Sequence, residues 1–216
     1  MAISTILFDL DGTIVDSKLG IQNAILYALR SLNVSAPNQE ILDHFVGPPL
    51  TFSFPKYCHL DKESTEEAIR QFRSYYREKG IFESSLFPEV LGTLDVLKCK
   101  GYHLYIATSK PQYFAEQILE YLGASPFFDG IIGSNPDGTR LQKIEVITSL
   151  LETYHLSKDE VIMIGDTPFD ILPANELSIP SVAVLYGAGT EQELKNAHPT
   201  FCISHLDELP PLLASM

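Results

Sequence analysis

Short apolar runs recur along the chain, and stretches with helical spacing separate them. The runs cover residues 3–8, 102–107, 130–134, 161–165, 181–185 and 201–203. Several are almost entirely apolar, which is typical of strands buried on both faces of a parallel sheet. Helical spacing of apolar residues fills the intervals 89–99, 111–121, 141–154 and 190–196. This order predicts an α/β fold, a doubly wound parallel sheet with a Rossmann-like core.

The interval between the first two runs breaks this alternation. It is far longer than the roughly dozen residues that one crossover connection needs. It contains helical patterns of its own, one over residues 19–32 and another that opens at a Ser64–Glu67 capping box. We therefore expect a small all-α cap inserted at residues 16–84, with residues 1–15 and 85–216 forming the α/β core.

Charge and composition narrow the class of partner. The chain has 15 basic and 28 acidic residues, a formal net charge of −13, so nucleic-acid polymers and anionic membranes are unfavourable partners. Cys58, Cys99 and Cys202 lie far apart without a C-x-x-C spacing, which favours reduced, mostly buried thiols. The sequence shows no leader-like segment and no long apolar span. We expect a cytoplasmic protein without a membrane segment, either a monomer or a homodimer.

Polar side chains follow the ends of four of the predicted strands. They are Asp9 and Asp11, then Thr108, Ser109 and Lys110, then Ser134 and Asn135, and finally Asp166 and Asp170. In open parallel sheets, ligands bind beyond the carboxyl ends of the strands. Clustered carboxylates are costly unless a cation, a proton or a reaction requires them. The strand ends therefore predict a charged site built from separate parts of the chain.

Each of these residues also has an ordinary structural interpretation. The first two aspartates could form an Asp-rich turn, and Asp166 could cap the following helix. Asp170 also suits a helix dipole, and Thr108 alone would be an ordinary loop hydroxyl. The combination of all of them is more specific than any single member.

The motifs resemble those of the haloacid dehalogenase-like superfamily of phosphohydrolases. D-L-D-G-T stands at 9–13, a strand-terminal threonine at 108, a downstream lysine at 143, and G-D-x-x-x-D at 165–170. The helical insert directly after the first motif resembles members close to phosphoglycolate phosphatase. The resemblance covers essentially the whole chain.

The resemblance implies a role for each matching residue. Asp9 would attack phosphorus to form an aspartyl-phosphate, and Asp11 would protonate the leaving alkoxide and then activate water. Thr108 and the backbone N–H of Ser109 would hold phosphoryl oxygens. Lys143 would neutralise phosphate charge and restrain the nucleophile.

The resemblance also implies Mg²⁺ as cofactor. Its ligands would be Asp9, the backbone carbonyl of Asp11, and Asp166, with Asp170 bound directly, bound through water or adjacent to the ligands. A hard cation with few protein oxygens and several waters fits magnesium better than calcium.

The implied reaction is hydrolysis of a small phosphorylated metabolite, with phosphoglycolate as one example. A nucleoside 5′-monophosphate or pyrophosphate is the alternative substrate, and a phosphomutase or a non-catalytic binding module is less favoured. In the cap, Gly47 and His44 are candidates for contact with the substrate. Lys110 competes with Lys143 as the phosphate lysine, and we expect it to face solvent or the cap.

Four further positions carry expectations about the backbone. Gly187 and Gly189 are interpreted as flexible loop residues near the rim of the sheet. Pro173 is tolerable only in the first turn of a helix. Ser178 stands where the family usually has a glycine, so a strained turn is expected there.

Overall fold

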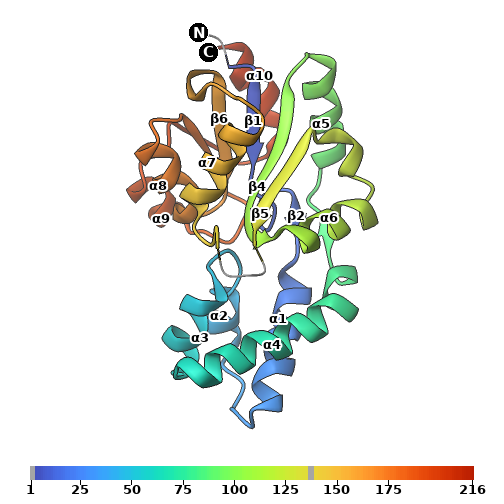
Figure 1. Ribbon diagram of the computed structural model, residues 1–216. Helices are drawn as coiled ribbons and strands as arrows, with labels where there is room; N and C mark the ends of the chain where they lie inside the picture. The colour runs from blue at the N-terminus through green and yellow to red at the C-terminus, as the bar shows by residue number, and fades with distance from the viewer. Residues whose placement is uncertain (1–2, 136–138) are drawn as a thin grey trace.

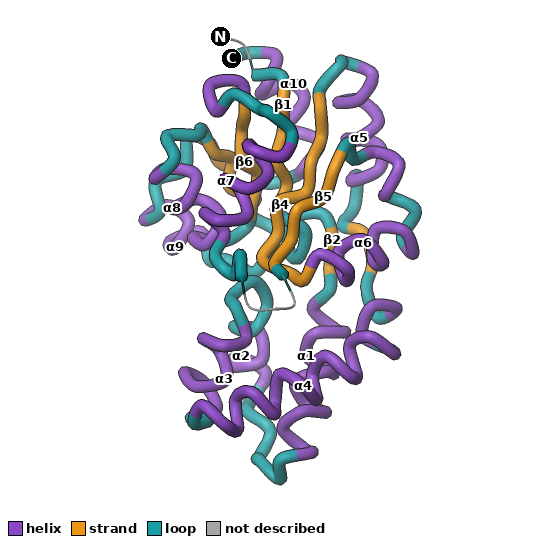
Figure 2. The backbone as a smooth tube through the Cα atoms, viewed as in Figure 1, coloured by secondary structure: helices purple, strands orange, loops and turns teal. Residues whose placement is uncertain are grey.

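The core of the protein is a six-stranded parallel sheet (Figures 1 and 2). The computed structural model describes residues 3–135 and 139–216. The strand order is β5-β4-β1-β6-β7-β8. The strands are β1 (Thr5–Phe8), β4 (His103–Pro111), β5 (Gly130–Ser134), β6 (Val161–Gly165), β7 (Ser181–Val184) and β8 (Phe201–Ile203). The chain crosses from β5 back past β1 to β6, so the strand order reverses beside β1.

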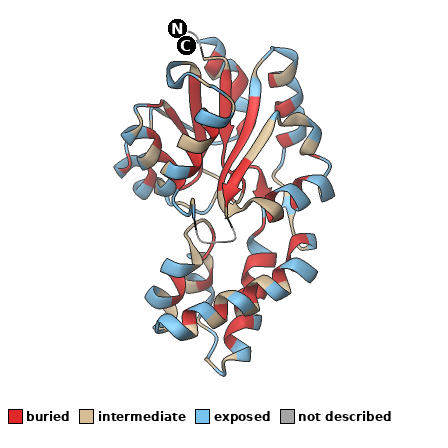
Figure 3. Cartoon of the chain, in the orientation of Figure 1, coloured by how far each residue is buried: buried red, intermediate tan, exposed pale blue. Residues whose placement is uncertain are grey.

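Helices cover both faces of this sheet, which confirms the predicted doubly wound α/β class. They are α5 (Val90–Cys99), α6 (Gln112–Tyr121), α7 (Lys143–Thr153), α8 (Pro168–Glu176), α9 (Glu191–Asn196) and α10 (Leu209–Ala214). Alternate strand residues enter opposite cores: Ile6 and Phe8 pack in the cluster that includes α5, α6 and α10, whereas Leu7 packs with α7 and α8. Figure 3 shows the strands buried and the outer helix faces exposed.

Four helices form a separate lobe beyond the carboxyl ends of the strands (Figure 1). We call them the helical lobe: α1 (Lys18–Ser31), α2 (Gln39–Asp43), α3 (Leu50–Cys58) and α4 (Lys62–Glu78). Two short antiparallel strands, β2 (Val15–Asp16) and β3 (Ser85–Leu86), carry the chain into and out of the lobe. The start of β1 and the end of α10 lie at the opposite end of the molecule.

The start of α4 differs from the sequence prediction. The helix begins at Lys62 with Asp61 as its N-cap, and the Asp61 carboxylate accepts a hydrogen bond from the Ser64 N–H at 2.8 Å. The predicted helix start at a Ser64–Glu67 capping box is therefore wrong, because Asp61, an equally good capping residue, stands three positions earlier.

The predicted burial of the cysteines is also wrong. Cys58 is only half-buried, and Cys99 and Cys202 are exposed. Among the described residues, no helix is long and apolar enough to cross a membrane.

The chain around α8 departs from helix rules at two points. Pro173 lies inside the helix rather than in its first turn, contrary to the prediction. Ser178 adopts a left-handed conformation with φ of 60°, which confirms the strained turn. The N–H groups of Ser178 and Ile179 bond to the carbonyls of Asn175 and Ala174, so the helix ends in a Schellman motif.

Candidate active site

Three predicted site residues lie at the carboxyl ends of neighbouring strands. Asp9 follows β1, Asp166 follows β6, and Thr108 lies near the end of β4. The N–H of Asp9 donates to the Ile164 carbonyl at 2.9 Å, which ties the end of β1 to β6. These strands flank the point where the strand order reverses, the usual ligand position in such sheets.

The turn after β1 brings the first aspartate motif against Asp166. Gly12 has φ of +90°, and a Cβ on it would lie 2.1 Å from Asp166 Oδ2. Only glycine fits both the backbone conformation and this close approach. The next residue, Thr13, donates its hydroxyl to Asp166 Oδ1 at 3.2 Å.

Three carboxylates form a buried cluster in which one oxygen from each lies within 4.8 Å of the other two. They belong to Asp9, Asp166 and Asp170. Burial raises the pKa of Asp9 to about 7; Lys143 opposes this shift, and Asp170 adds to it. Burial, together with the negative charges of Asp170 and Asp9, raises the pKa of Asp166 well above its ordinary value. Such clustered, hard oxygen donors fit a divalent cation of the magnesium type.

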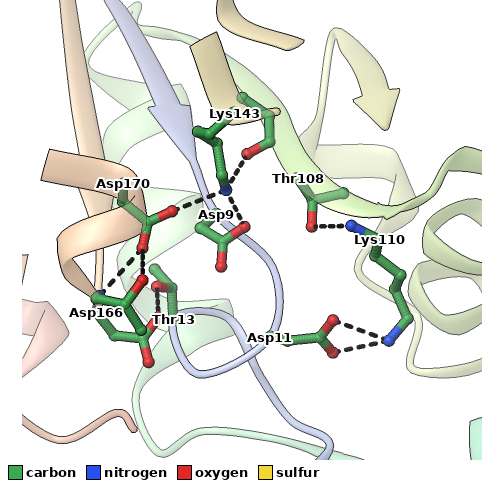
Figure 4. Close-up of polar contacts among 10 residues, drawn as sticks. Asp9, Asp11, Thr13, Thr108, Lys110, Lys143, Asp166 and Asp170 are labelled. Atoms are coloured by element: carbon green, nitrogen blue, oxygen red, sulfur yellow. Dashed lines mark hydrogen bonds and ion pairs between the residues drawn. The ribbon is translucent and has the colours of Figure 1, made fainter. Parts of the chain in front are cut away.

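Lys143 is the cation already present beside this cluster (Figure 4). Its ammonium donates to Asp9 Oδ1 at 2.5 Å, to the Ala107 carbonyl at 2.9 Å, and pairs with Asp170 Oδ1 at 2.8 Å. Burial alone would lower the pKa of Lys143, but Asp170 and Asp9 more than offset it and the pKa is raised. All three N–H donors are engaged by the protein, so Lys143 restrains Asp9 in this arrangement.

Asp11 lies outside the three-carboxylate cluster and has a different cation. The Lys110 ammonium donates to its two carboxylate oxygens at 2.8 and 2.9 Å, and the Ser17 hydroxyl donates to Oδ1 at 2.5 Å. The Lys110 side chain is only 6% exposed. The sequence predicts that Lys110 faces either solvent or the cap. The structure excludes solvent and supports the cap, because the Lys110 ammonium also donates to the Tyr76 hydroxyl of α4 at 2.8 Å.

The loop after β7 fixes the position of Asp166. The Ala188 N–H donates to Asp166 Oδ2 at 2.7 Å. A Cβ on Gly187 would lie 2.3 Å from the Asp166 Cβ, so the glycine is required by close packing. Gly189 also packs closely against Asp166, since a Cβ added to it would lie 2.2 Å from the Asp166 carbonyl oxygen. The interpretation of both glycines as flexible loop residues is therefore wrong.

Asp166 does not cap α8, contrary to that structural alternative. Thr167 is the N-cap, and the Asp170 carboxylate accepts hydrogen bonds from its backbone N–H at 3.1 Å and its hydroxyl at 2.9 Å. Asp170 thus combines the ordinary helix-cap role with an ion pair to Lys143.

A cavity of about 140 Å³ lies between the strand ends and the helical lobe. Asp9, Asp11, Thr108, Ser109 and Lys143 all line it. Its other walls come mainly from apolar and aromatic side chains of both parts of the protein: Ile21, Phe45, Leu50, Ile69, Phe72, Tyr76, Phe114, Leu141 and Phe169.

The two residues that the sequence proposed in the lobe have different positions. Gly47 lines the cavity. His44 is exposed, stacks on the Tyr57 ring at 5.6 Å between centroids, and is absent from the cavity wall. The sequence suggests His44 because it lies near Gly47 along the chain, but His44 is the C-cap of the short helix α2, which ends at Asp43.

The structure also brings in residues that the sequence patterns did not assign to the site. Thr13 and Ala188 hold Asp166, whereas Ser17 and Tyr76 surround the Asp11–Lys110 pair. The G-A-G sequence at 187–189, directly after the β7 region, was a signal for close backbone approach. The contacts of Tyr76 depend on how the lobe packs on the core, and a local sequence pattern cannot predict that packing.

Comparisons with known proteins agree with this geometry. Residues 6–184 match the family described as haloacid dehalogenase-like hydrolase. The chain is 37% identical over 210 residues to a 5′-nucleotidase from Pseudomonas aeruginosa, covering 97% of this chain and 95% of that one. It is 29% identical over 212 residues to a phosphoglycolate phosphatase from Colwellia psychrerythraea, covering 94% of each. A crystal structure of a predicted phosphatase from Clostridium acetobutylicum matches with a TM-score of 0.96 and 38% identity over 100% of both chains.

The chain belongs to the haloacid dehalogenase-like hydrolases, which confirms the resemblance found in its motifs. Within that class it is a phosphatase, a phosphoric monoester hydrolase, since it matches phosphatases over nearly its full length.

Proposed function

We propose that the protein hydrolyses a small phosphomonoester with Mg²⁺ and an aspartyl-phosphate intermediate. The observation that carries this proposal is the buried cluster of Asp9, Asp166 and Asp170 at the strand ends, with Lys143 paired to two of its members. A fourth carboxylate, that of Asp11, borders the same cavity and would carry out proton transfer.

The first chemical step is attack by Asp9 on phosphorus. A carboxylate oxygen of Asp9 forms the new bond, and the bond from phosphorus to the leaving oxygen breaks. Asp11 gives that oxygen a proton, so the alcohol departs neutral. Thr108 and the Ser109 N–H orient the phosphoryl oxygens, and Lys143 keeps Asp9 in line.

The second step returns the enzyme to its starting state. Asp11, now a carboxylate, takes a proton from water as that water attacks the phosphorus of the aspartyl-phosphate. The bond to Asp9 breaks, inorganic phosphate leaves, and Asp11 again carries the proton.

Asp9, Asp166 and the backbone carbonyl of Asp11 would hold Mg²⁺, with Asp170 as a further direct or water-bridged ligand. When bound, the ion offsets repulsion between the carboxylates and the phosphate and stabilises charge in the transition state.

The identity of the leaving group is the finer part of the proposal. A small substrate such as phosphoglycolate has a carboxylate that suits Arg73, a cationic residue on the cavity wall. The aromatic walls at Phe45, Phe72 and Phe114 instead favour a flat apolar group, such as the base of a nucleoside 5′-monophosphate. The 5′-nucleotidase relative gives this second candidate additional support. Pyrophosphate has no apolar group that could pack against these walls.

The remaining expectations belong to the same proposal. Residues 16–84 act as a cap over a core made of residues 1–15 and 85–216, and closure of the cap excludes water. The protein works in the cytoplasm, as a monomer or homodimer, on a small metabolite rather than on a nucleic-acid polymer or a membrane.

The deciding experiment is phosphate release from a panel of phosphorylated metabolites by wild type and Asp9→Asn. The panel contains phosphoglycolate, nucleoside 5′-monophosphates, sugar phosphates and pyrophosphate. We expect Asp9→Asn to abolish turnover and Asp95→Asn, a matched change at an exposed residue of α5, to retain it. Equal rates for wild type and Asp9→Asn would reject the nucleophile.

A further inference from the structure

The carboxylate of Asp11 is held apart from the other acids of the site. Figure 4 shows it turned toward Lys110, whereas Asp9 and Asp170 share Lys143. The two aspartates of the D-L-D-G-T motif thus have separate lysine partners. Since the proposed function gives Asp11 the proton-transfer role, whatever holds its carboxylate affects the placement of the transferred proton.

Lys110 has no free donor in this arrangement. An ammonium group has three N–H donors. The Lys110 ammonium has three acceptors: the two oxygens of Asp11 at 2.8 and 2.9 Å and the Tyr76 hydroxyl at 2.8 Å. A phosphate contact would require Lys110 to release one of these partners. The geometry therefore favours a role in holding Asp11 over direct binding of phosphate.

Tyr76 makes this contact from the helical lobe. It lies on α4 and is almost completely buried. Its ring stacks on Phe72 of the same helix at 5.4 Å and meets Phe114 of the core helix α6 edge-on at 5.2 Å. The Lys110 ammonium also lies 4.5 Å from the centre of the Tyr76 ring. The packing of the lobe on the core thereby fixes where the Tyr76 hydroxyl stands.

A second contact to Asp11 also comes from the segment that enters the lobe. Ser17 lies between β2 and α1, and its hydroxyl donates to Asp11 Oδ1 at 2.5 Å. On the core side, Lys110 is attached to the phosphate-binding region, because its N–H donates to the Thr108 hydroxyl at 3.2 Å. Asp11 is therefore held between the core and the lobe.

Stability alone gives a weak reason for this arrangement. Burying an ammonium and a carboxylate costs desolvation energy that their attraction only about balances, so well-packed apolar residues are often as stabilising. The pair is instead well suited to orienting one carboxylate, because three hydrogen bonds, two from Lys110 and one from Ser17, fix both of its oxygens.

We infer that Lys110 is a positioning residue that aligns Asp11 for proton transfer and links this alignment to the seated lobe through the Tyr76 hydroxyl. The inference rests on the proposed function, in which Asp11 protonates the leaving group. Lys110 and Tyr76 act through Asp11 and need no contact with the reacting phosphorus.

The leaving group provides a readout that separates positioning from general structural damage. 4-Nitrophenolate is a weak base and departs without a proton, whereas the alkoxide of glycerol 3-phosphate needs one. A misplaced Asp11 should therefore slow phosphoenzyme formation much more with the alkyl substrate. The rates are measured in the first turnover by rapid quench, with Mg²⁺ present, on the full chain.

The first variant removes a single oxygen. Tyr76→Phe keeps the ring packing and deletes the contact to Lys110; we expect phosphoenzyme formation from glycerol 3-phosphate to fall roughly tenfold, below the ~10²-fold cost of a 1 Å misplacement. The rate with 4-nitrophenyl phosphate and both KM values should stay near wild type. Tyr75→Phe is the matched control, because its hydroxyl bonds to Glu83 outside the site and its loss should change neither rate.

The second variant removes the charge. Lys110→Met should lower the alkyl rate about 100-fold and the nitrophenyl rate only about threefold, in the range of general-acid contributions. Equal losses with both substrates, or an increase confined to KM, would overturn the inference by assigning Lys110 to structure or to phosphate binding. If Lys110→Met does not fold, Tyr76→Phe decides: wild-type rates with both substrates reject the link.

Failure of the inference and failure of the proposed function remain distinguishable. A wild-type protein that forms no phosphoenzyme with either substrate rejects the proposed function. An active wild type, an inactive Asp9→Asn and an unaltered leaving-group preference in Tyr76→Phe reject only the role of Lys110 and Tyr76.

Discussion

Two lysines divide the negative charge of the active site between them. Lys143 faces Asp9 and Asp170, and Lys110 faces Asp11. At the scale of single residues, the important property is that each ammonium has its donors occupied by protein acceptors. The acids of the site are consequently oriented before a substrate arrives, which reduces the rearrangement that the reaction requires.

The raised pKa of Asp9 predicts how the stability of the metal-free protein depends on pH. Because burial raises this pKa to about 7, above the ordinary value near 3.9 of an unfolded chain, the folded state binds more protons between these limits. The contribution of Asp9 to the free energy of unfolding is therefore complete below about pH 4 and is lost as pH rises through about 7.

Urea denaturation between pH 5.5 and 8.5 in chelator tests this sign. Wild type should lose free energy of unfolding with rising pH more steeply than Asp9→Asn, in which the titrating group is gone. Parallel slopes for the two proteins would show that Asp9 does not titrate in this range. The net charge of −13 affects both proteins almost equally, so the difference in slope reports the titration of Asp9 together with its effect on Asp166.

The close approach of Gly187 to Asp166 predicts a loss of activity on adding one methyl group. In Gly187→Ala the new Cβ would lie 2.3 Å from the Asp166 Cβ and 2.5 Å from the Gly12 carbonyl oxygen, so Asp166 must move. We expect kcat to fall on the order of 10²-fold, the cost of a shift near 1 Å.

Gly92→Ala is the matched control for that substitution. Gly92 lies on the exposed side of α5, and its Cβ would meet no atom within 4 Å. Here kcat should stay at the wild-type value, and the free energy of unfolding should rise by roughly 0.5–1 kcal/mol from the helix propensity of alanine. A normal kcat in Gly187→Ala would show that this loop does not set the position of Asp166.

At the scale of helices and strands, the sequence predicted those features that the local pattern of apolar and polar residues determines. The strands were recognisable because residues such as Ile6, Leu7 and Phe8 are buried on both faces and must all be apolar. The start of α4 was misplaced because Asp61 and Ser64 are both good caps, and only the backbone geometry chooses between them. The partners of Lys110 come from segments far apart in sequence, so no local pattern could identify them.

The end of α8 offers a prediction at the same scale. Ser178 holds a left-handed conformation that costs a side-chain-bearing residue roughly 1 kcal/mol and glycine almost nothing. Ser178→Gly should therefore raise the free energy of unfolding by about 0.5–1 kcal/mol, measured by urea denaturation.

Ser74→Gly is the control for the backbone effect. Ser74 is exposed within α4, in regular helix, where glycine is the poorer residue by about 0.5 kcal/mol. The same chemical change should thus stabilise at one position and destabilise at the other. A loss of stability at both would contradict the proposed relief at Ser178.

At the scale of the whole molecule, a cation site inside an acidic protein should couple ion binding to folding. A ligand that binds only the folded state stabilises it by about 2.7 kcal/mol at 100 times its dissociation constant. Mg²⁺ should therefore raise the thermal unfolding temperature of wild type, and this rise should be reduced in Asp166→Asn, which removes one cluster charge.

Sodium chloride at matched ionic strength controls for general screening of the net charge of −13. An equal rise with both salts, or an undiminished rise in Asp166→Asn, would place the ion elsewhere. Chelation should abolish turnover by wild type, and added Mg²⁺ should restore it.

The position of the chain ends has a practical consequence. The first strand starts, and α10 ends, at the far side of the sheet from the cavity and the helical lobe (Figure 1). A surface tether or a fusion partner joined at either end would leave the cavity entrance unobstructed.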